Sequence, residues 1–123
     1  MVHGIIAWVG LLVSLSAAPL SAQESFYRGK TLRLVVGFSA GGGFDVYSRA
    51  ISRHIGKHIA GNPAVVVENM TGAGSMVAAN HVFRAAKADG LTIGNINGGL
   101  FVQQLLGWPG IEFDAAKFEH VGV

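Results

Sequence analysis

Three short glycine-rich segments hold the residues of this chain whose types and spacing best suit ligand binding. They are residues 41–43 (Gly-Gly-Gly), residues 72–75 (Gly-Ala-Gly-Ser) and residues 97–99 (Asn-Gly-Gly). Glycine lets the backbone adopt positive φ and approach a ligand without an intervening Cβ. Each segment follows an apolar run, and helix N-termini behind such segments offer unpaired N–H groups that favour negative charge. The segments therefore predict contacts to carboxylate or phosphate oxygens, with tight strand-to-helix turns as the alternative interpretation.

Two serines and one aspartate lie in or beside these segments. Ser39 and Ser75 lack the Gly-x-Ser-x-Gly context of a nucleophile elbow, so we expect hydroxyl donors to an anion instead. Asp45 lies just inside the start of a predicted helix, where a carboxylate stabilises the helix dipole. An alternative role for Asp45 is to orient a hydroxyl or amine of the ligand.

Nucleotide chemistry fits the residues less well. The segment 72–77 resembles the start of a dinucleotide fingerprint, but Val77 stands where Gly or Ala is expected. No acidic residue follows the next strand to bind a ribose, and Asp89 precedes that strand. The triplet 29–31 (Gly-Lys-Thr) has the end of a P-loop, but Glu24 occupies the position of its first glycine. A dinucleotide-binding oxidoreductase remains the alternative enzyme class.

A metal site is not expected. His54 and His58 are four residues apart on a predicted helix, a spacing that can share a metal ion. The chain has no cysteine, and no glutamate accompanies the pair at the spacing of a metalloprotease. Histidines late in a helix more often remain solvated and stabilise its C-terminal dipole. We therefore expect no metal and no cofactor.

The elements that position these loops alternate between strands and helices. Apolar, β-branched runs predict strands over residues 31–38, 64–68 and 91–96. Residues 44–59 predict an amphipathic helix, with Tyr47 and Ile51 on the apolar side and Arg49 on the other. Residues 76–88 predict a second helix. This β-α-β-α-β order predicts an α/β fold with a parallel sheet of right-handed units.

The first 22 residues differ from the rest of the chain. Residues 1–22 contain no Asp, Glu, Lys or Arg, and an apolar run is followed by small residues up to Ala22. This order is typical of a secretory signal peptide, although the usual positive start is missing. A short membrane anchor is the alternative, but the run falls short of the ~20 residues that span a bilayer. A net charge of +2 gives no argument for nucleic acid.

Three motifs in order resemble the periplasmic solute receptors of tripartite tricarboxylate transporters, the Bug proteins. They are Val35-Val36-Gly37-Phe38-Ser39-Ala40-Gly41-Gly42-Gly43-Phe44-Asp45, Val65-Val66-Val67-Glu68-Asn69-Met70-Thr71-Gly72-Ala73-Gly74-Ser75 and Ala88-Asp89-Gly90-Leu91-Thr92-Ile93-Gly94. The segment 113–118 also fits this family. The resemblance implies a type II periplasmic-binding-protein fold, a Venus flytrap of two lobes, with residues 23–123 as an incomplete first lobe.

The resemblance also implies the site and the partners. The ligand would be a small organic carboxylate, such as a tricarboxylate or dicarboxylate, which the receptor passes to membrane permease subunits. Together with the third glycine segment, the expected ligand-binding residues are Phe38, Ser39, Ala40, Gly41, Gly42, Gly43, Asp45, Gly72, Ala73, Gly74, Ser75, Asn97 and Gly98. The family often has a small hydroxyl residue at the position of Phe44, so that contact is not carried over.

These expectations place the chain in the periplasm, without catalytic activity and, for a complete receptor, without a stable oligomer. Such receptors are substantially longer than this chain. A truncated product without function, with an exposed apolar sheet edge, therefore stays open as an alternative.

Overall fold

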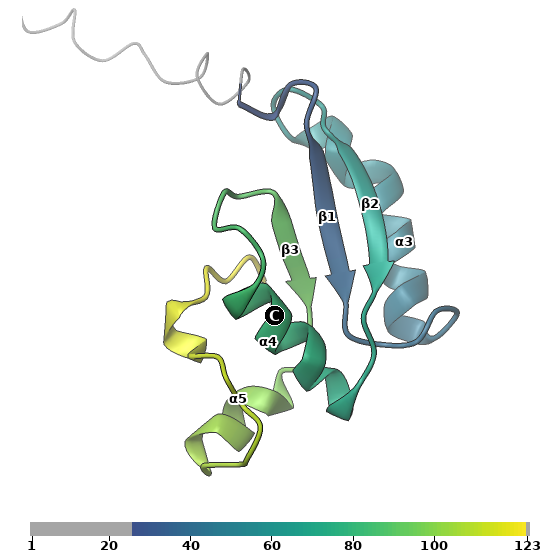
Figure 1. Ribbon diagram of the computed structural model, residues 1–123. Helices are drawn as coiled ribbons and strands as arrows, with labels where there is room; N and C mark the ends of the chain where they lie inside the picture. The colour runs from purple at the N-terminus through teal and green to yellow at the C-terminus, as the bar shows by residue number, and fades with distance from the viewer. Residues whose placement is uncertain (1–25, 123) are drawn as a thin grey trace, which may run out of the picture.

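A three-stranded parallel sheet forms the centre of the computed structural model, which describes residues 26–122 (Figure 1). The strands are β1 (Thr31–Val36), β2 (Ala64–Asn69) and β3 (Thr92–Asn95), in the spatial order β2-β1-β3. β1 is parallel to both neighbours, with Arg33 opposite Val66 on one side and Thr92 on the other. The predicted α/β class and parallel sheet are confirmed. The predicted signal peptide, residues 1–22, lies outside the described residues.

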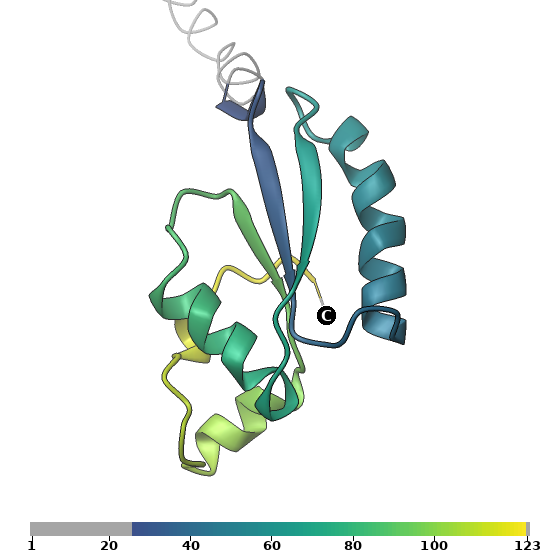
Figure 2. The same cartoon turned by 45° about the vertical axis from the view of Figure 1, so that its right-hand side comes forward.

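Two helices cover opposite faces of the sheet (Figure 2). Helix α3 (Gly43–Ile55) links β1 to β2, and helix α4 (Met76–Arg84) links β2 to β3. From β1 to β2 the chain steps across the sheet to one side of β1. From β2 to β3 it steps back across the sheet to the other side of β1. Because parallel crossovers are right-handed, this reversal places the two helices on different faces. Short 3₁₀ turns follow α3 (η1, Gly56–His58) and precede α4 (η2, Ala73–Ser75).

The central strand β1 forms the core of the sheet. Leu32, Leu34 and Val36 are buried toward α3, and Val35 is buried toward α4. Burial on both faces explains the continuous apolar run that identified this strand in the sequence. Strand β2 lies at the edge and is less covered, with Val66 47% exposed. The sheet is therefore anchored by the strand that ends directly at the first glycine loop.

Helix α3 packs on the sheet with a polar side. Its buried residues are Asp45 and Ser48, whereas Tyr47 is 71% exposed and Ile51 is 53% exposed. Arg49, expected on the solvent side, is only half exposed and points to Asp45. The helix and its amphipathic character are confirmed, but the apolar side faces solvent. Hydrogen bonds to the strand ends decide this orientation. Asp45 accepts from Asn69 at the end of β2, and Ser48 accepts from Asn95 at the end of β3.

A second core lies beneath α4 and was not predicted. Helix α5 (Gly99–Leu105) follows β3, and the chain then returns over α4 through a 3₁₀ turn, η3 (Ala115–Lys117). Ala79, Leu100 and Phe113 are buried together, with Phe83 and Phe118 packed against them. The Phe83 and Phe118 rings meet edge to face at 5.6 Å. This cluster fixes α4 and α5 relative to one another behind the second and third glycine loops.

The helices in residues 26–122 are too short or too polar to cross a membrane.

Candidate functional site

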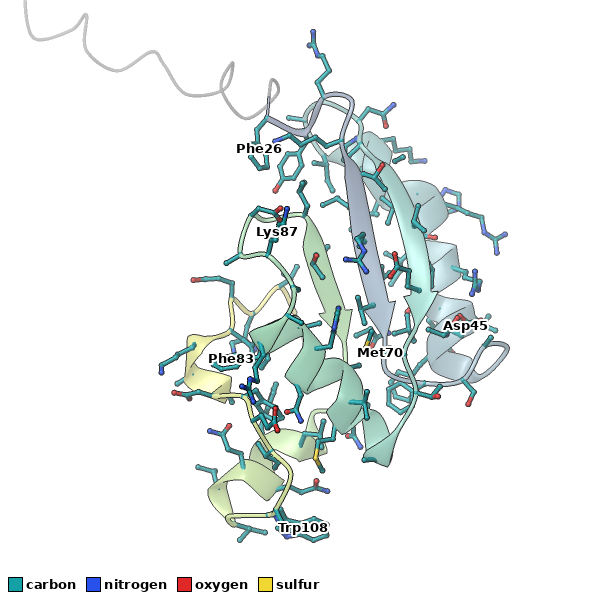
Figure 3. The ribbon with its side chains drawn as sticks, viewed as in Figure 1. Phe26, Asp45, Met70, Phe83, Lys87 and Trp108 are labelled. Atoms are coloured by element: carbon teal, nitrogen blue, oxygen red, sulfur yellow. The ribbon has the colours of Figure 1, made fainter. Side chains whose placement is uncertain are left out.

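The three glycine segments lie at the same edge of the sheet. Parallel strands end on one side, so the loops after β1, β2 and β3 meet where the strands' carboxyl ends lie (Figure 1). In open α/β sheets, ligands bind at this edge, between two adjacent strands whose following connections run to opposite faces of the sheet. Strands β1 and β3 are adjacent here, and they lead into α3 and α5 respectively. Figure 3 shows Asp45 and Met70 at this edge, away from Phe26 and Lys87 at the other end.

The Asp45 carboxylate is the centre of a hydrogen-bonded hub beneath the first loop. It is 2% exposed and accepts from the Gly41 N–H at 2.8 Å and from Arg49 Nε at 3.0 Å. Asn69 Nδ2 donates to its other oxygen at 2.9 Å. The donated bonds of Arg49, Gly41 and Asn69 hold the pKa of the Asp45 carboxyl well below its usual range. The carboxylate thus stays ionised and fixes the loop backbone from within.

Asn69 ties the end of β2 to the first loop. Its Nδ2 donates to the Phe38 carbonyl at 3.0 Å as well as to Asp45, and its Oδ1 accepts from Arg49 Nη2 at 2.9 Å. Sequence reasoning missed both Asn69 and Arg49 as members of the site. The spacing of Asp45 and Arg49, four residues apart on a helix, was a usable signal. Asn69 lies in the second motif of the resemblance, but no local pattern linked it to the first loop.

The second loop is held by close packing. A Cβ built on Gly37 would lie 2.5 Å from Ser75 Cβ, so the end of β1 and Ser75 touch directly. Residues 72–75 have four consecutive positive φ angles, of 138°, 45°, 63° and 79°. Ala73 and Ser75 adopt this region without being glycine, which costs about 1–2 kcal/mol each. Strain of this kind persists only where surrounding contacts impose it, and it clusters at functional sites.

Ser75 connects the second loop to the third. Its side chain is 1% exposed, and its Oγ accepts from the Asn97 N–H at 2.8 Å. Asn97 Oδ1 in turn accepts from the Gly99 N–H at 2.9 Å. Asn95, the last residue of β3, donates through Nδ2 to Ser48 Oγ at 2.8 Å and joins this edge to α3. The three loops are therefore cross-linked side by side.

Burial separates the predicted ligand-binding residues into two groups. Asp45 and Ser75 are buried and already paired, so their side chains position the loops. Phe38 is partly buried. The other members are exposed, namely Ser39, Ala40, Gly41, Gly42, Gly43, Gly72, Ala73, Gly74, Asn97 and Gly98. The exposed surface offers backbone N–H groups and small polar groups, which suits an anion held by hydrogen bonds.

Not every backbone N–H of the loops is available. The Gly41 N–H donates to Asp45, and the Gly42 N–H donates to the Ser39 carbonyl at 3.2 Å. Gly43 and Phe44 are the first two residues of α3, where N–H groups have no partner within the helix. The helix dipole adds partial positive charge at this point. The first loop can thus present oriented donors around the start of α3.

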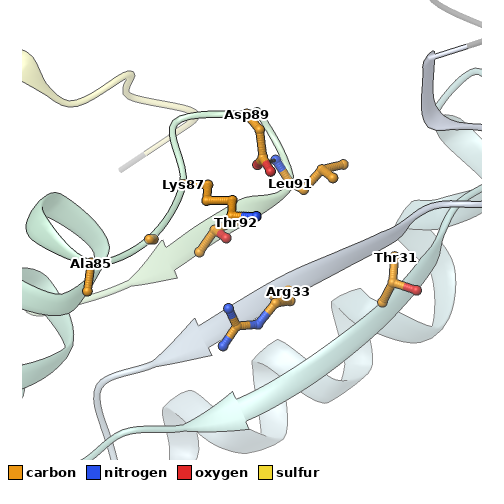
Figure 4. A pocket seen from close by; sticks show the side chains of 8 residues that line it. Thr31, Arg33, Ala85, Lys87, Asp89, Leu91 and Thr92 are labelled. Atoms are coloured by element: carbon orange, nitrogen blue, oxygen red, sulfur yellow. Dashed lines mark hydrogen bonds between the residues drawn. The ribbon is translucent and has the colours of Figure 1, made fainter.

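A hollow of about 330 Å³ lies at the opposite edge of the sheet (Figure 4). Arg33, Lys87 and Asp89 line it with smaller residues. Arg33 is occupied there by a two-pronged bond to Glu68, at 2.9 and 2.6 Å, which lowers the pKa of Glu68. Asp89 caps the Leu91 N–H at 3.0 Å. Because Arg33 and Asp89 already have partners, the hollow is a weaker candidate than the loop edge.

The histidine pair lies elsewhere. His54 is in the last turn of α3, and His58 ends η1. Within residues 26–122, no three His, Cys, Asp or Glu side chains lie close enough together to hold a metal ion.

Curated bacterial proteins are similar to this chain. It is 34% identical over 91 residues to the UPF0065 protein in the gbd 5′ region of Cupriavidus necator, which covers 74% of this chain and 27% of that protein. It is 33% identical over 91 residues to protein BugT of Bordetella pertussis, covering 72% of this chain and 26% of BugT. A UPF0065 protein of Bordetella bronchiseptica is 30% identical over 122 residues, covering 94% of this chain and 35% of the relative. No family model matches the chain.

The chain thus spans about a quarter to a third of the length of the curated relatives it matches.

Proposed function

Because this chain belongs to the family of UPF0065 and Bug proteins, we propose that it is a solute receptor and not an enzyme. Its ligand is a small carboxylated organic anion, bound at the carboxyl edge of the sheet. The receptor delivers this anion to the permease subunits of a tripartite tricarboxylate-type transporter. Residues 1–22 direct it to the periplasm, with cleavage near Ala22.

The observation that carries this proposal is the cross-linked set of three exposed loops. Asn69 joins the first loop to the end of β2, and Ser75 joins the second loop to Asn97 of the third. Loops fixed in this way need little ordering when a ligand arrives, which preserves affinity. The donors that the first loop presents are the backbone N–H groups at the start of α3. This arrangement supports recognition of a carboxylate by hydrogen bonds alone.

The shape of the whole receptor is also part of the proposal. The sheet described here has one open ligand edge, and the curated relatives are about three to four times longer than the matched region. We infer that residues 23–123 belong to the first lobe of a type II, Venus-flytrap receptor. A second lobe would then close over the loops and exclude water from the bound carboxylate.

Thermal unfolding of the full chain in the presence of separate ligands tests the proposal. Citrate, succinate and benzoate represent carboxylates, and NAD represents the competing oxidoreductase class. We expect at least one carboxylate to raise the melting temperature and NAD to leave it unchanged. Stabilisation by NAD without any effect of the carboxylates would refute the receptor function. Circular dichroism and sizing of the same sample check the third alternative, since a compact monomer that melts cooperatively excludes a non-folding product.

A matched pair of variants locates the binding edge. A Cβ added at position 43 would meet no atom within 4 Å, so we expect Gly43→Val to be accommodated and to add bulk at the first residue of α3. We expect this variant to keep its fold and lose the carboxylate-dependent stabilisation. Ala60→Val adds the same bulk at an exposed position near the other end of the sheet and should retain it. Equal responses of the two variants would place the ligand elsewhere.

A further inference from the structure

Two phenylalanines form a stacked pair at the neck of the first loop. Phe38 follows the end of β1 and Phe44 is the second residue of α3, so the five residues 39–43 lie between them. The rings are nearly parallel, at an interplanar angle of 8°, with their centroids 3.9 Å apart. Phe44 is 49% exposed, whereas Phe38 is partly buried. One phenyl ring of the pair thus offers apolar surface beside the predicted carboxylate contacts.

Isolated exposed apolar side chains are ordinary on protein surfaces, and the position of this one gives it meaning. Its ring is held by Phe38 from behind, so little side-chain freedom is lost when a ligand packs on it. Aromatic rings associate through their faces and edges, with an energy beyond that of their buried area. A planar apolar group could therefore lie against Phe44 while its substituent reaches the loop backbone.

The charges at this edge limit the number of carboxylates that the ligand carries. Residues 37–44, 69–76 and 95–99 contain no Lys, Arg or His. Arg49, which lies beneath the loop, already donates to Asp45 and Asn69. The buried Asp45 carboxylate adds negative charge below the same loop. A second or third carboxylate of a ligand would therefore meet no cationic side chain of these loops.

We propose that the site selects a monocarboxylate with a flat aromatic body, with the carboxylate against residues 39–43 and the ring on Phe44. This inference rests on the proposed function, since it names the ligand class of the same site. It assigns Phe44 as the specificity-determining residue.

Isothermal titration of the full chain with four probes tests the inference. Benzoate carries one carboxylate and a flat ring, and cyclohexanecarboxylate has a similar size without aromaticity. Succinate and citrate carry two and three carboxylates. We expect benzoate to bind most tightly, with amide NMR shifts concentrated at residues 40–44.

Three variants distinguish a loss of the Phe44 ring contact from a loss of folding. Phe44→Ser should weaken benzoate binding about fivefold and leave succinate binding unchanged. Phe44→Leu keeps an apolar side chain, so it should fold normally and lose the preference for benzoate over cyclohexanecarboxylate. Tyr47→Ser removes another exposed aromatic ring from α3, 71% exposed, and should change neither affinity.

The possible failures are distinguishable. If succinate or citrate binds more tightly than benzoate, or if both Phe44 variants bind benzoate like the wild type, the inference is wrong and the receptor function stands. If none of the four carboxylates binds, both the inference and the receptor function are wrong.

Discussion

The loops after β1 and β2 lie side by side at the same edge of the sheet, but different interactions fix them. The first loop is exposed over residues 39–43 and is held from below by charge and hydrogen bonds among Asp45, Arg49 and Asn69. The second is held by shape, because Ser75 packs directly against Gly37 and forces successive positive φ angles. In the first loop, the polar hub fixes the backbone from below, so the exposed surface of residues 39–43 stays open to a ligand. In the second loop, close packing against Gly37 leaves almost no room for added volume.

This difference predicts that the second loop is the more sensitive to added volume. Gly37→Ala should destabilise the chain by about 3 kcal/mol, because overpacking of a tight contact costs about 1–3 kcal/mol and the new Cβ would lie 2.5 Å from Ser75 Cβ. Urea unfolding of the full chain measures the loss. Gly43→Ala is the control, since its Cβ meets nothing within 4 Å and should be neutral or slightly stabilising. Equal stabilities of the two variants would show that the two loops tolerate volume alike.

Truncation of the polar hub should produce the next largest effect. Asn69→Ala removes the donor to the Phe38 carbonyl and to one oxygen of the buried Asp45 carboxylate, while Gly41 and Arg49 still donate to the other oxygen. We expect a loss of about 2 kcal/mol in the free energy of unfolding, within the range for unsatisfied buried groups. Thr71→Ala, at an exposed residue just after β2, serves as the control. A neutral Asn69→Ala would mean that Arg49 and Gly41 suffice to hold the first loop.

The two loops should also differ in their response to acid. Asp45 has a lowered pKa in the folded state, so its contribution to stability is complete above the unfolded pKa of about 3.9 and is lost as the pH falls through the lower folded value. Asp45→Asn keeps an acceptor for Gly41, so its cost at neutral pH should be smaller than that of Asn69→Ala. The gap between wild type and Asp45→Asn should shrink as the pH falls below 4, measured by urea unfolding. A gap that does not change with pH would contradict the ionised hub.

The smallest effect is expected where the loops meet. Ser75→Ala preserves the packing against Gly37 and removes only the Oγ acceptor of the Asn97 N–H. Asn97 is exposed, so its backbone N–H can donate to water instead. The loss in unfolding free energy should therefore be about 1 kcal/mol. Ser39→Ala, at an exposed serine of the first loop, should cost less. If Ser75→Ala costs as much as Gly37→Ala, the hydrogen bond and not the packing holds the second loop.

The strands and the glycine loops were predictable from local patterns. The apolar runs gave strands within two residues of β1, β2 and β3, and the glycines after each run gave the loop edge. The predicted second helix, residues 76–88, ends four residues early because the Ala85 and Ala86 N–H groups both donate to the His81 carbonyl. Helix α5 was missed, since it begins at glycines and is defined by the burial of Leu100.

The sequence by itself determined the order of the three strands and their two crossover helices, the parallel sheet and the position of the glycine loops. These depend on residues close together in the chain, whose spacing sets backbone conformation and side-chain periodicity. Only the tertiary structure decided that α3 turns its polar side inward and that Asn69 meets Asp45, 24 residues earlier in the chain. Such contacts depend on the register of β1 with β2, which brings the two strand ends together. A hydrogen bond requires two groups within about 3 Å, and no local pattern encodes that distance.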